Sequence, residues 1–310
     1  MNNPSKMPCC YCPSTLLCVD DSQQDLCDIA VSLVLKNIRY RLQLKPKVML
    51  DLINSQKSPW RPNPGKEIYN AKRFERVCVA VLDYDMPEMN GLQFCQRVSV
   101  PSIRRIIVSG NLPPADAAKA LQGNWIRGHV PKGTADTMPA LQTLVECSIA
   151  EHFCEESGTF QQAGEQAGSC LIDCQFIKWF HQMLDALRAE EYYLLDAAGT
   201  FLLGTMHREV YGLCVRTLPQ LQQLAQQASD KGAPKYIVEG LKRGQCMVCP
   251  PDPCAQKLTE ELAWERCVQP VRHVLTEGKQ NYYCSWGAGL FDVDNSQITS
   301  FYQYQEQNPD

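Results

Sequence analysis

The chain has 310 residues, which is enough for two domains that each bury a core of their own. Residues 1–140 carry 18 Lys and Arg against 12 Asp and Glu, a net charge of +6, whereas residues 141–310 carry 12 against 22, a net charge of −10. The acidic C-terminal half disfavours binding to nucleic-acid phosphates, and no apolar run reaches the roughly 18 residues that a membrane span needs.

The N-terminus lacks the apolar core of a secretory signal peptide, so we expect the chain to remain in the cytoplasm. The 17 cysteines are an odd number, and many lie inside apolar runs, where a thiol behaves as a small apolar group. This pattern favours a reducing compartment over a framework of disulfides. Residues 1–13, which include three of the cysteines, are predicted to form a flexible tail.

Strand-like and helix-like segments alternate over residues 14–154. Strands are predicted at 15–19, 47–52, 77–82, 106–108 and 126–130, and helices at 22–41, 91–98, 113–122 and 136–150. Continuous apolar runs, such as the one at 77–82, are typical of strands covered on both faces. The alternation predicts a doubly wound parallel sheet, with a proline-rich inserted loop at 54–66.

A second domain is predicted to follow a linker. Residues 155–169 are rich in Gly, Gln and Glu, a composition typical of linkers. Residues 170–310 are predicted to form a smaller α+β domain without internal repeats. Its predicted helices are 171–187, 219–229 and 260–275, and its predicted strands are 192–195, 201–203, 210–215, 282–285 and 290–293.

Polar residues follow four of the predicted strands of the first domain. Asp20 and Asp21 follow the first strand, Asp83 follows the strand at 77–82, and Ser109 and Lys132 follow the last two. Because the carboxyl ends of parallel strands meet in one crevice, we expect these side chains to lie close together. An acidic pair, a lone carboxylate, a hydroxyl and a lysine are suited to phosphoryl transfer.

The run Asp-x-x-Met-Pro-x-Met-x-Gly at 83–91, joined to the acidic pair, the serine and the lysine, resembles the receiver domain of bacterial two-component response regulators. The match covers about residues 14–150. It implies a flavodoxin-like, doubly wound sheet of five parallel strands. It also implies phosphoryl transfer to Asp83 from a histidine kinase or a histidine phosphotransfer protein. Receivers catalyse their own phosphorylation and dephosphorylation, and no other activity is supported.

The resemblance also assigns the residues around the nucleophile. Asp83 attacks the phosphorus atom. Asp21, Asp83 and the backbone carbonyl of Asp85 are implied to bind Mg²⁺ or Mn²⁺, which offsets the crowded negative charge. Asp20 is implied to act through a water molecule.

Lys132 is implied to pair with the phosphoryl oxygens, and the hydroxyl of Ser109 to donate to them. Gly110 leaves room for the phosphoryl group. Asp85 and Asn111 flank it, and we expect them to set the lifetime of the phosphorylated state. The added charge of roughly −2 should pull the serine inward and bias contact with the C-terminal domain or a partner.

Three features depart from the usual pattern. Many receivers have an aromatic switch residue three positions before the lysine, and His129 occupies that position here; the alternative is a surface histidine at a strand end. Pro131 precedes the lysine, whereas in the family a proline commonly follows it. The long gap between Asp21 and Asp83 and the residues at 68–83 resemble a proteobacterial subgroup whose C-terminal domain has no assigned role.

Two further groups of residues are candidates for chemistry. Cys246, Cys249 and Cys254 lie in a proline-rich stretch and form a candidate zinc site. Only one tight pair of ligands is visible there, which favours free thiols. His181 lies on the predicted helix at 171–187, but the strands that follow disfavour the four-helix bundle that a histidine phosphotransfer site needs.

Three outputs remain open for the C-terminal domain. It is a protein-interaction or ligand-sensing domain, of which a PAS-like pocket is one version, and a downstream protein partner reads the phosphorylated state. Alternatively, it is a regulated enzyme such as a phosphatase or another hydrolase, although no catalytic pattern supports this. An atypical DNA-binding regulator is disfavoured by the net charge of −10. A second copy of the receiver is a further candidate partner, in a homodimer.

Overall fold

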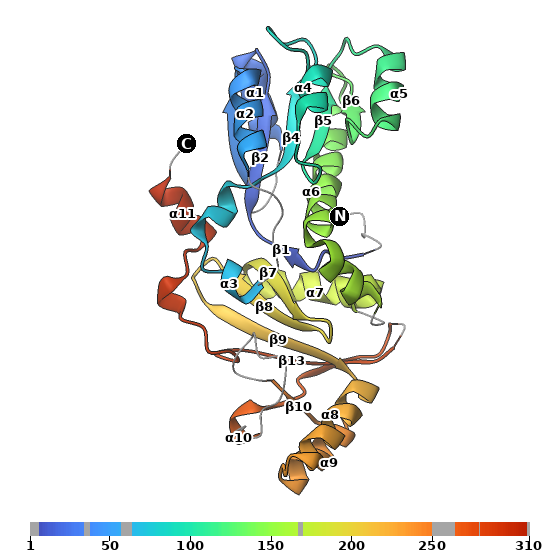
Figure 1. The fold of residues 1–310 in the computed structure, drawn as a ribbon, viewed down its shortest axis with the longest axis vertical. Coiled ribbons are helices and arrows are strands. Elements are labelled where there is room, and N and C mark those ends of the chain that lie inside the picture. The colour runs from blue at the N-terminus through green and yellow to red at the C-terminus, as the bar shows by residue number, and fades with distance from the viewer. Residues whose placement is uncertain are drawn as a thin grey trace.

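The computed structural model describes residues 6–33, 38–56, 64–166, 170–249, 264–278 and 280–308. Two large sheets organise them (Figure 1). A parallel sheet has the order β3-β2-β4-β5-β6, and an antiparallel sheet has the order β1-β7-β8-β9-β13-β12. A small pair, β10 (Cys246–Val248) and β11 (Val268–Pro270), lies beside the second sheet. None of the helices in these ranges is both long and apolar enough to cross a membrane.

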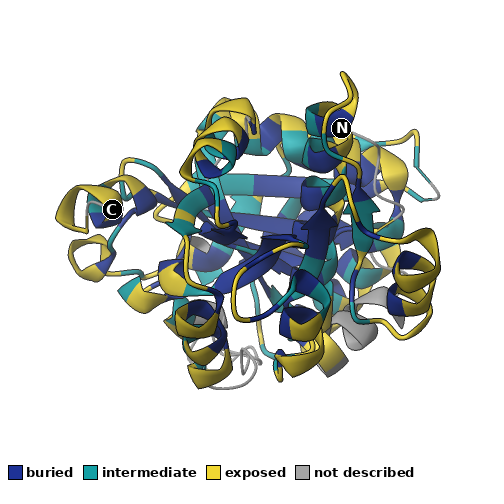
Figure 2. Ribbon diagram, turned by 90° about the horizontal axis from the view of Figure 1, so that it is seen from above, coloured by how far each residue is buried: buried dark blue, intermediate teal, exposed yellow. Residues whose placement is uncertain are grey.

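The parallel sheet is flavodoxin-like. Its strands are β2 (Ser14–Val19), β3 (Ile38–Gln43), β4 (Val77–Asp83), β5 (Arg104–Val108) and β6 (Gly128–Val130). Counted along the chain, their order is 2-1-3-4-5, which is the flavodoxin order. The helices are α1 (Gln23–Ser32), α2 (Pro46–Ser55), α4 (Gly91–Arg97), α5 (Pro114–Gln122) and α6 (Thr137–Gln166), with the short α3 (Pro64–Glu67) and the 3₁₀ turn η1 (Ala71–Glu75). Every residue of β2 and β4 is buried, because helices cover both faces (Figure 2).

The predictions for the first helix and the second strand were wrong. The helix predicted at 22–41 ends at Ser32, and the second strand is β3 rather than 47–52. Residues 47–52 belong to α2, which starts with a proline and buries positions 46, 49, 50 and 53. This spacing of i, i+3, i+4 and i+7 is helical, and proline suits the first turn of a helix.

The second unit is α+β, as predicted. Its sheet contains β1 (Cys10–Tyr11), β7 (Ala189–Asp196), β8 (Thr200–Thr205), β9 (Val210–Thr217), β12 (His273–Leu275) and β13 (Tyr282–Ala288). Its other elements are η2 (Cys170–Ile172), α7 (Cys174–Leu187), α8 (Leu218–Asp230), α9 (Lys235–Lys242), α10 (Trp264–Cys267), η3 (Asn295–Gln297) and α11 (Phe301–Gln307). The narrower PAS-like assignment stays a prediction.

The two faces of the second sheet are covered by different helices. Phe201 and Leu203 of β8 pack with α7, whereas Leu202 belongs to the core that α8 and α9 complete. This alternation follows from the two-residue period of a strand. The described part of the helix predicted at 260–275 is only α10, followed by two short strands. The strand predicted at 290–293 is absent: residues 290–291 form a bend, and residues 292–293 are irregular.

The described part of the predicted N-terminal tail, residues 6–13, is ordered against the second sheet rather than flexible. β1 pairs with β7 in antiparallel register, Cys10 opposite Tyr193 and Tyr11 opposite Tyr192. Met7 is fully buried in the cluster that includes α7. A sheet edge with free backbone groups is satisfied by an added strand, and here the N-terminus supplies it. The second unit is therefore built from both ends of the chain.

The predicted linker at 155–169 is also wrong over its described residues, because residues 155–166 are helical. α6 starts beside β6 and continues to Gln166, with a break at Gly158, where φ is +48°. Tyr11 of β1 packs against Phe153 of α6, with ring centroids 5.2 Å apart. The main hydrophobic cluster includes residues of both sheets. The two units thus share one core rather than being joined by a loose connection.

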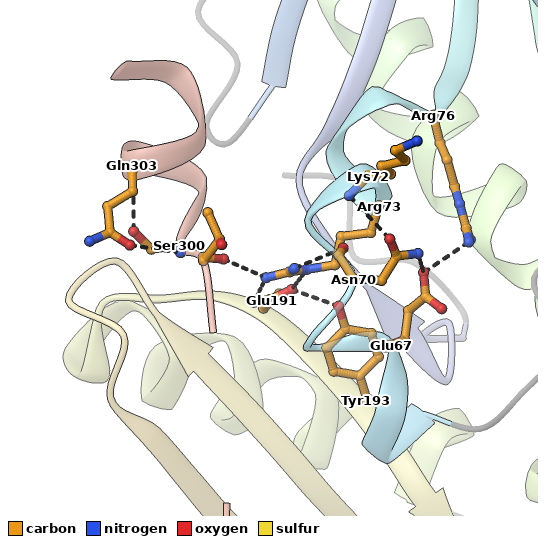
Figure 3. A network of polar contacts seen from close by, with 10 residues as sticks. Glu67, Asn70, Lys72, Arg73, Arg76, Glu191, Tyr193, Ser300 and Gln303 are labelled. Atoms are coloured by element: carbon orange, nitrogen blue, oxygen red, sulfur yellow. Dashed lines mark hydrogen bonds and ion pairs between the residues drawn. The ribbon is translucent and has the colours of Figure 1, made fainter. Parts of the chain in front are cut away.

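A buried ion pair joins the two units (Figure 3). Arg73 of η1 and Glu191 of β7 form a bidentate pair, with both N–O distances 2.8 Å. Arg73 also donates to the carbonyl of Thr299, just before α11, at 2.8 Å. Phe74, the next residue, packs against Phe301 of α11. Because η1 directly precedes β4, these contacts place the second unit at the amino ends of the parallel strands (Figure 1).

Candidate functional site

The predicted polar residues come together at the carboxyl ends of the parallel strands, at the opposite end of the sheet from the second unit. Asp20 follows β2, Asp83 ends β4, Ser109 follows β5, and Lys132 lies two positions beyond β6. The Lys132 Nζ atom is 2.7 Å from Asp83 Oδ1 and 2.8 Å from Asp20 Oδ2. The lysine reaches both carboxylates even though Pro131 precedes it.

The two carboxylates that contact Lys132 from the strand ends are buried, with residue exposures of 2% for Asp20 and 8% for Asp83. Burial raises the pKa of Asp20, although Lys132 and the backbone N–H of Ser22 act in the opposite direction. Burial alone would lower the pKa of Lys132, but hydrogen bonds to carboxylates raise it above its usual value. The ammonium group is therefore charged, and it neutralises a crevice that would otherwise hold closely spaced negative charges.

The phosphoacceptor candidate is held in one orientation. While Asp83 Oδ1 pairs with the lysine, Oδ2 accepts the backbone N–H of Asp85 at 2.6 Å. A Cβ atom at Gly91 would collide with the backbone carbonyl of Asp83, which explains the glycine that ends the motif. Gly91 begins α4, and its N–H donates to the carbonyl of Tyr84 at 2.9 Å. The loop after β4 is thus folded back tightly on the strand end.

Ser109 is buried and is surrounded by backbone and side-chain contacts. Its hydroxyl oxygen accepts the N–H of Asn111 at 3.0 Å. Its carbonyl oxygen lies 3.1 Å from His129 Nε2 and accepts the N–H of Lys132 at 3.3 Å. A carbonyl oxygen only accepts, so Nε2 of the histidine must carry the proton. His129 is half-buried and turned towards the serine, which disfavours the alternative of a surface histidine.

The two residues expected to set the lifetime of the phosphorylated state lie at the mouth of the crevice. Asn111 Nδ2 donates to Asp85 Oδ2 at 3.0 Å, and both residues are near solvent. A Cβ atom at Gly110 would meet no atom within 4 Å, so space is available beside Ser109. The hydrogen bond between Asn111 and Asp85 thus links the loops that follow β4 and β5, and the space lies at Gly110.

Asp25 belongs to the site but was not predicted as a site residue. Its Oδ2 atom is 2.7 Å from Lys132 Nζ, as close as Asp83. In the sequence its only signal is that of an acidic residue near the start of a helix. Its backbone N–H donates to the hydroxyl of Ser22, the N-cap of α1, at 3.2 Å. Because α1 starts beside the end of β2, its first turn lies over the crevice.

The residues present suit a hard divalent cation. Asp21 is exposed at the same turn as buried Asp20, and Asp83 and the carbonyl of Asp85 add further oxygen atoms. In the described part of the chain, no three His, Cys, Asp or Glu side chains are already arranged as a metal site. Mg²⁺ does not require such a cage, because it binds one or two carboxylates together with water and phosphate.

The candidate zinc ligands do not form a shared site among the described residues. Cys246 Sγ lies 3.8 Å from the carbonyl of Ile237, whereas Cys249 is buried and hydrogen-bonds to the Cys214 thiol. Cys254 falls outside the described residues. His181, the candidate for phosphotransfer, lies partly buried on α7, and this burial lowers its pKa.

Comparisons with known proteins add whole-chain similarity. No family model matches the chain, and no curated protein matches it. The response regulator LqsR of Legionella pneumophila is 26% identical, with a TM-score of 0.80 over 97% of this chain and 96% of that one. A receiver domain from an HD domain-containing protein of Pseudomonas fluorescens is 16% identical and covers 48% of this chain and 95% of its own, with a TM-score of 0.38. The receiver-type strand order, the motif residues at the strand ends and the similarity to LqsR identify the chain as a response regulator with a receiver domain.

Proposed function

We propose that this protein is a phosphorylation switch in which Asp83 accepts a phosphoryl group from a histidine kinase or a histidine phosphotransfer protein. The carboxylate oxygen attacks phosphorus, the phosphorus–nitrogen bond of phosphohistidine breaks, and the departing imidazole nitrogen takes up a proton. The supporting observation is that Asp83 lies at the carboxyl end of β4, between the ammonium of Lys132 at 2.7 Å and the N–H of Asp85 at 2.6 Å. These donors orient the nucleophile and offset its charge.

Mg²⁺, or Mn²⁺ in its place, is the cofactor that this donor set favours. Asp21, Asp83 and the carbonyl of Asp85 would hold the ion, with Asp20 acting through water. When bound, the ion neutralises charge that the carboxylates and the phosphoryl group bring together. Lys132 supplies a further fixed positive charge, and water screens its partly buried ammonium less than it screens an exposed lysine.

The output of the switch is a change around Ser109 that a downstream protein reads. The serine hydroxyl now accepts from Asn111, and its backbone carbonyl lies against His129. Phosphorylation would give the hydroxyl a strongly charged acceptor, and a shift of Ser109 would change the contact with His129. The second unit is fixed at the other end of the sheet, so the surface beside α5 and β6 stays available to a partner.

Phosphorylation of the full chain tests the proposal directly. With Mg²⁺ and a small phosphodonor such as acetyl phosphate, the wild type should gain the mass of one phosphoryl group. Asp83→Asn should gain none. Asp116→Asn, which removes an exposed carboxylate from the first turn of α5, is the matched control and should behave like the wild type. A wild type that gains no mass, or a gain that persists in Asp83→Asn, contradicts the assignment.

A further inference from the structure

The ammonium group of Lys132 has no spare hydrogen-bond donor. A lysine ammonium carries three N–H groups. Three carboxylate oxygens surround Nζ, those of Asp25 and Asp83 at 2.7 Å and that of Asp20 at 2.8 Å. If this lysine is to pair with a phosphoryl oxygen, as the proposed function requires, one of these carboxylates must give up its place.

The three carboxylates differ in how readily they can withdraw. The Asp20 side chain is 3% exposed and is also tied to the N–H of Ser22 at 2.9 Å. Asp83 is the group that becomes phosphorylated, so it stays at the centre of the site. The Asp25 side chain is 41% exposed and can be hydrated when it leaves the lysine. Water can replace Lys132 as the partner of an exposed carboxylate, so moving away from the lysine costs less free energy for Asp25 than for the two buried carboxylates.

We propose that Asp25 is a positioning residue that acts through Lys132 and competes with the phosphoryl group for it. In the unphosphorylated protein Asp25 occupies the third donor of the ammonium. When the phosphoryl group arrives, Asp25 turns to solvent and the donor passes to a phosphoryl oxygen. Asp25 thereby raises the concentration of phosphodonor that the switch needs and disfavours the phosphorylated state. This inference rests on the proposed function.

The size of the effect follows from the exposure of the pair. Ion pairs of this exposure contribute a factor of about 1.5 to 5 to an equilibrium constant. Removing the negative charge of Asp25 also weakens the repulsion of an incoming anion, which acts in the same direction. Both effects are screened by salt, because Asp25 is near solvent.

Beryllofluoride, an anion that mimics a phosphoryl group on a carboxylate, provides the test. Its binding to the full chain in the presence of Mg²⁺ is followed by fluorine NMR. Asp25→Asn should reach half-saturation at a concentration about two to five times lower than the wild type, and the difference should shrink as salt is added. Asp25→Glu, which retains the charge, should restore binding like that of the wild type.

Asp28→Asn is the matched control. Asp28 lies one turn along α1 and is also exposed, but it accepts from Gln24 Nε2 at 2.7 Å rather than contacting the lysine. Its variant should bind like the wild type. If Asp25→Asn melts at a lower temperature, Asp25→Ser, which keeps a short polar side chain in the first turn, replaces it.

The outcomes separate this inference from the function on which it rests. If Asp25→Asn binds beryllofluoride no better than Asp28→Asn, or binds it less tightly, competition for Lys132 is refuted while the phosphorylation switch stands. If the wild type shows no Mg²⁺-dependent binding, the proposed function fails, and this inference fails with it.

Discussion

The buried pair between Arg73 and Glu191 should be a main determinant of how firmly the two units are joined, and Glu191→Gln tests this (Figure 3). The substitution removes the negative charge and turns one carboxylate oxygen into an amide group. The guanidinium of Arg73 then faces a donor where it had an acceptor. Tyr193, whose hydroxyl donates to Glu191 Oε2 at 2.6 Å, loses a charged partner as well.

The magnitude follows from burial. The Arg73 side chain is 0% exposed and that of Glu191 is 5% exposed, so water cannot replace the lost partner. Removing one member of such a pair typically costs about 3–5 kcal/mol, because the other charge is left buried and unpaired. For a chain of this size, each kcal/mol lowers the melting temperature by about 2 °C, so we expect a fall of about 6–10 °C. A loss this large is a sizeable part of the stability of a typical folded protein.

The control has the same hydrogen-bond geometry at the surface. Arg127 and Glu151 form a bidentate pair with both distances 2.7 Å, but their side chains are 45% and 37% exposed. Glu151→Gln should therefore cost less than about 1 kcal/mol. Urea denaturation of the full chain, followed by both fluorescence and circular dichroism, measures the two losses and shows whether the units unfold in one transition or two.

A double-mutant cycle completes the test. Replacing Arg73 and Glu191 together by methionine should cost less than the sum of the two single replacements, because the double variant leaves no unpaired charge in the interior. If Glu191→Gln costs no more than Glu151→Gln, or if the double replacement is simply additive, the pair does not join the units as we infer. If urea unfolds the chain in two transitions and Glu191→Gln shifts only one of them, the pair likewise does not join the two units.

Two further predictions concern stability and the fold of the site. Burial, and then the negative charge of Glu191, raise the pKa of Glu190 from 4.5 to about 7, so its contribution to stability is full below about pH 4.5 and is lost as the pH rises through 7. Glu190→Gln should remove this loss in urea denaturation between about pH 5 and 8, and a loss that persists unchanged would contradict the assignment. Gly91→Ala should cost about 1–3 kcal/mol and slow phosphorylation of Asp83, because the new methyl group meets the Asp83 carbonyl. Gly110→Ala, which meets no atom, should leave the free energy of unfolding unchanged, and equal losses for the two variants would refute the steric argument.

The residues of the site could be found from the sequence because each follows an apolar strand. A polar residue at the carboxyl end of a buried parallel strand lies beside the crevice at that end of the sheet, because the chain leaves the sheet there. The strand-end pattern alone therefore predicts that Asp20, Asp83, Ser109 and Lys132 lie near one another. Asp25 was missed because its position depends on how the first turn of α1 lies over the crevice. The pattern of polar residues at strand ends does not predict the orientation of a helix.

The features that were missed elsewhere depend on partners far away in the sequence. Two residues, Cys10 and Tyr11, carry too little pattern to predict a strand, and β1 exists because β7 offers it an edge. Arg73 and Glu191 are 118 positions apart, and neither lies in a motif. The composition at 155–169 suggested a linker, but composition does not record that α6 packs against both units. Local signals therefore located the site and most of the receiver strands, misplaced the second strand of the receiver, and did not predict how the second unit is attached.

The position of that attachment limits how a signal can travel. The site lies at the carboxyl ends of the parallel strands, and the Arg73–Glu191 pair lies at their amino ends, so the proposed phosphorylation would not free the second unit by breaking a direct contact with the site. α6 begins beside the site, where the hydroxyl of Thr137 donates to the carbonyl of Pro131 at 2.7 Å, and it continues to Phe153, which packs against Tyr11 of the second unit. A helix that is continuous between these points favours a small change of packing along α6 over release of the second unit. Among the described residues, His129 lies at the end of the sheet away from the second unit, so under the proposed function a separate protein at that end and the second unit would both respond to one phosphorylation event.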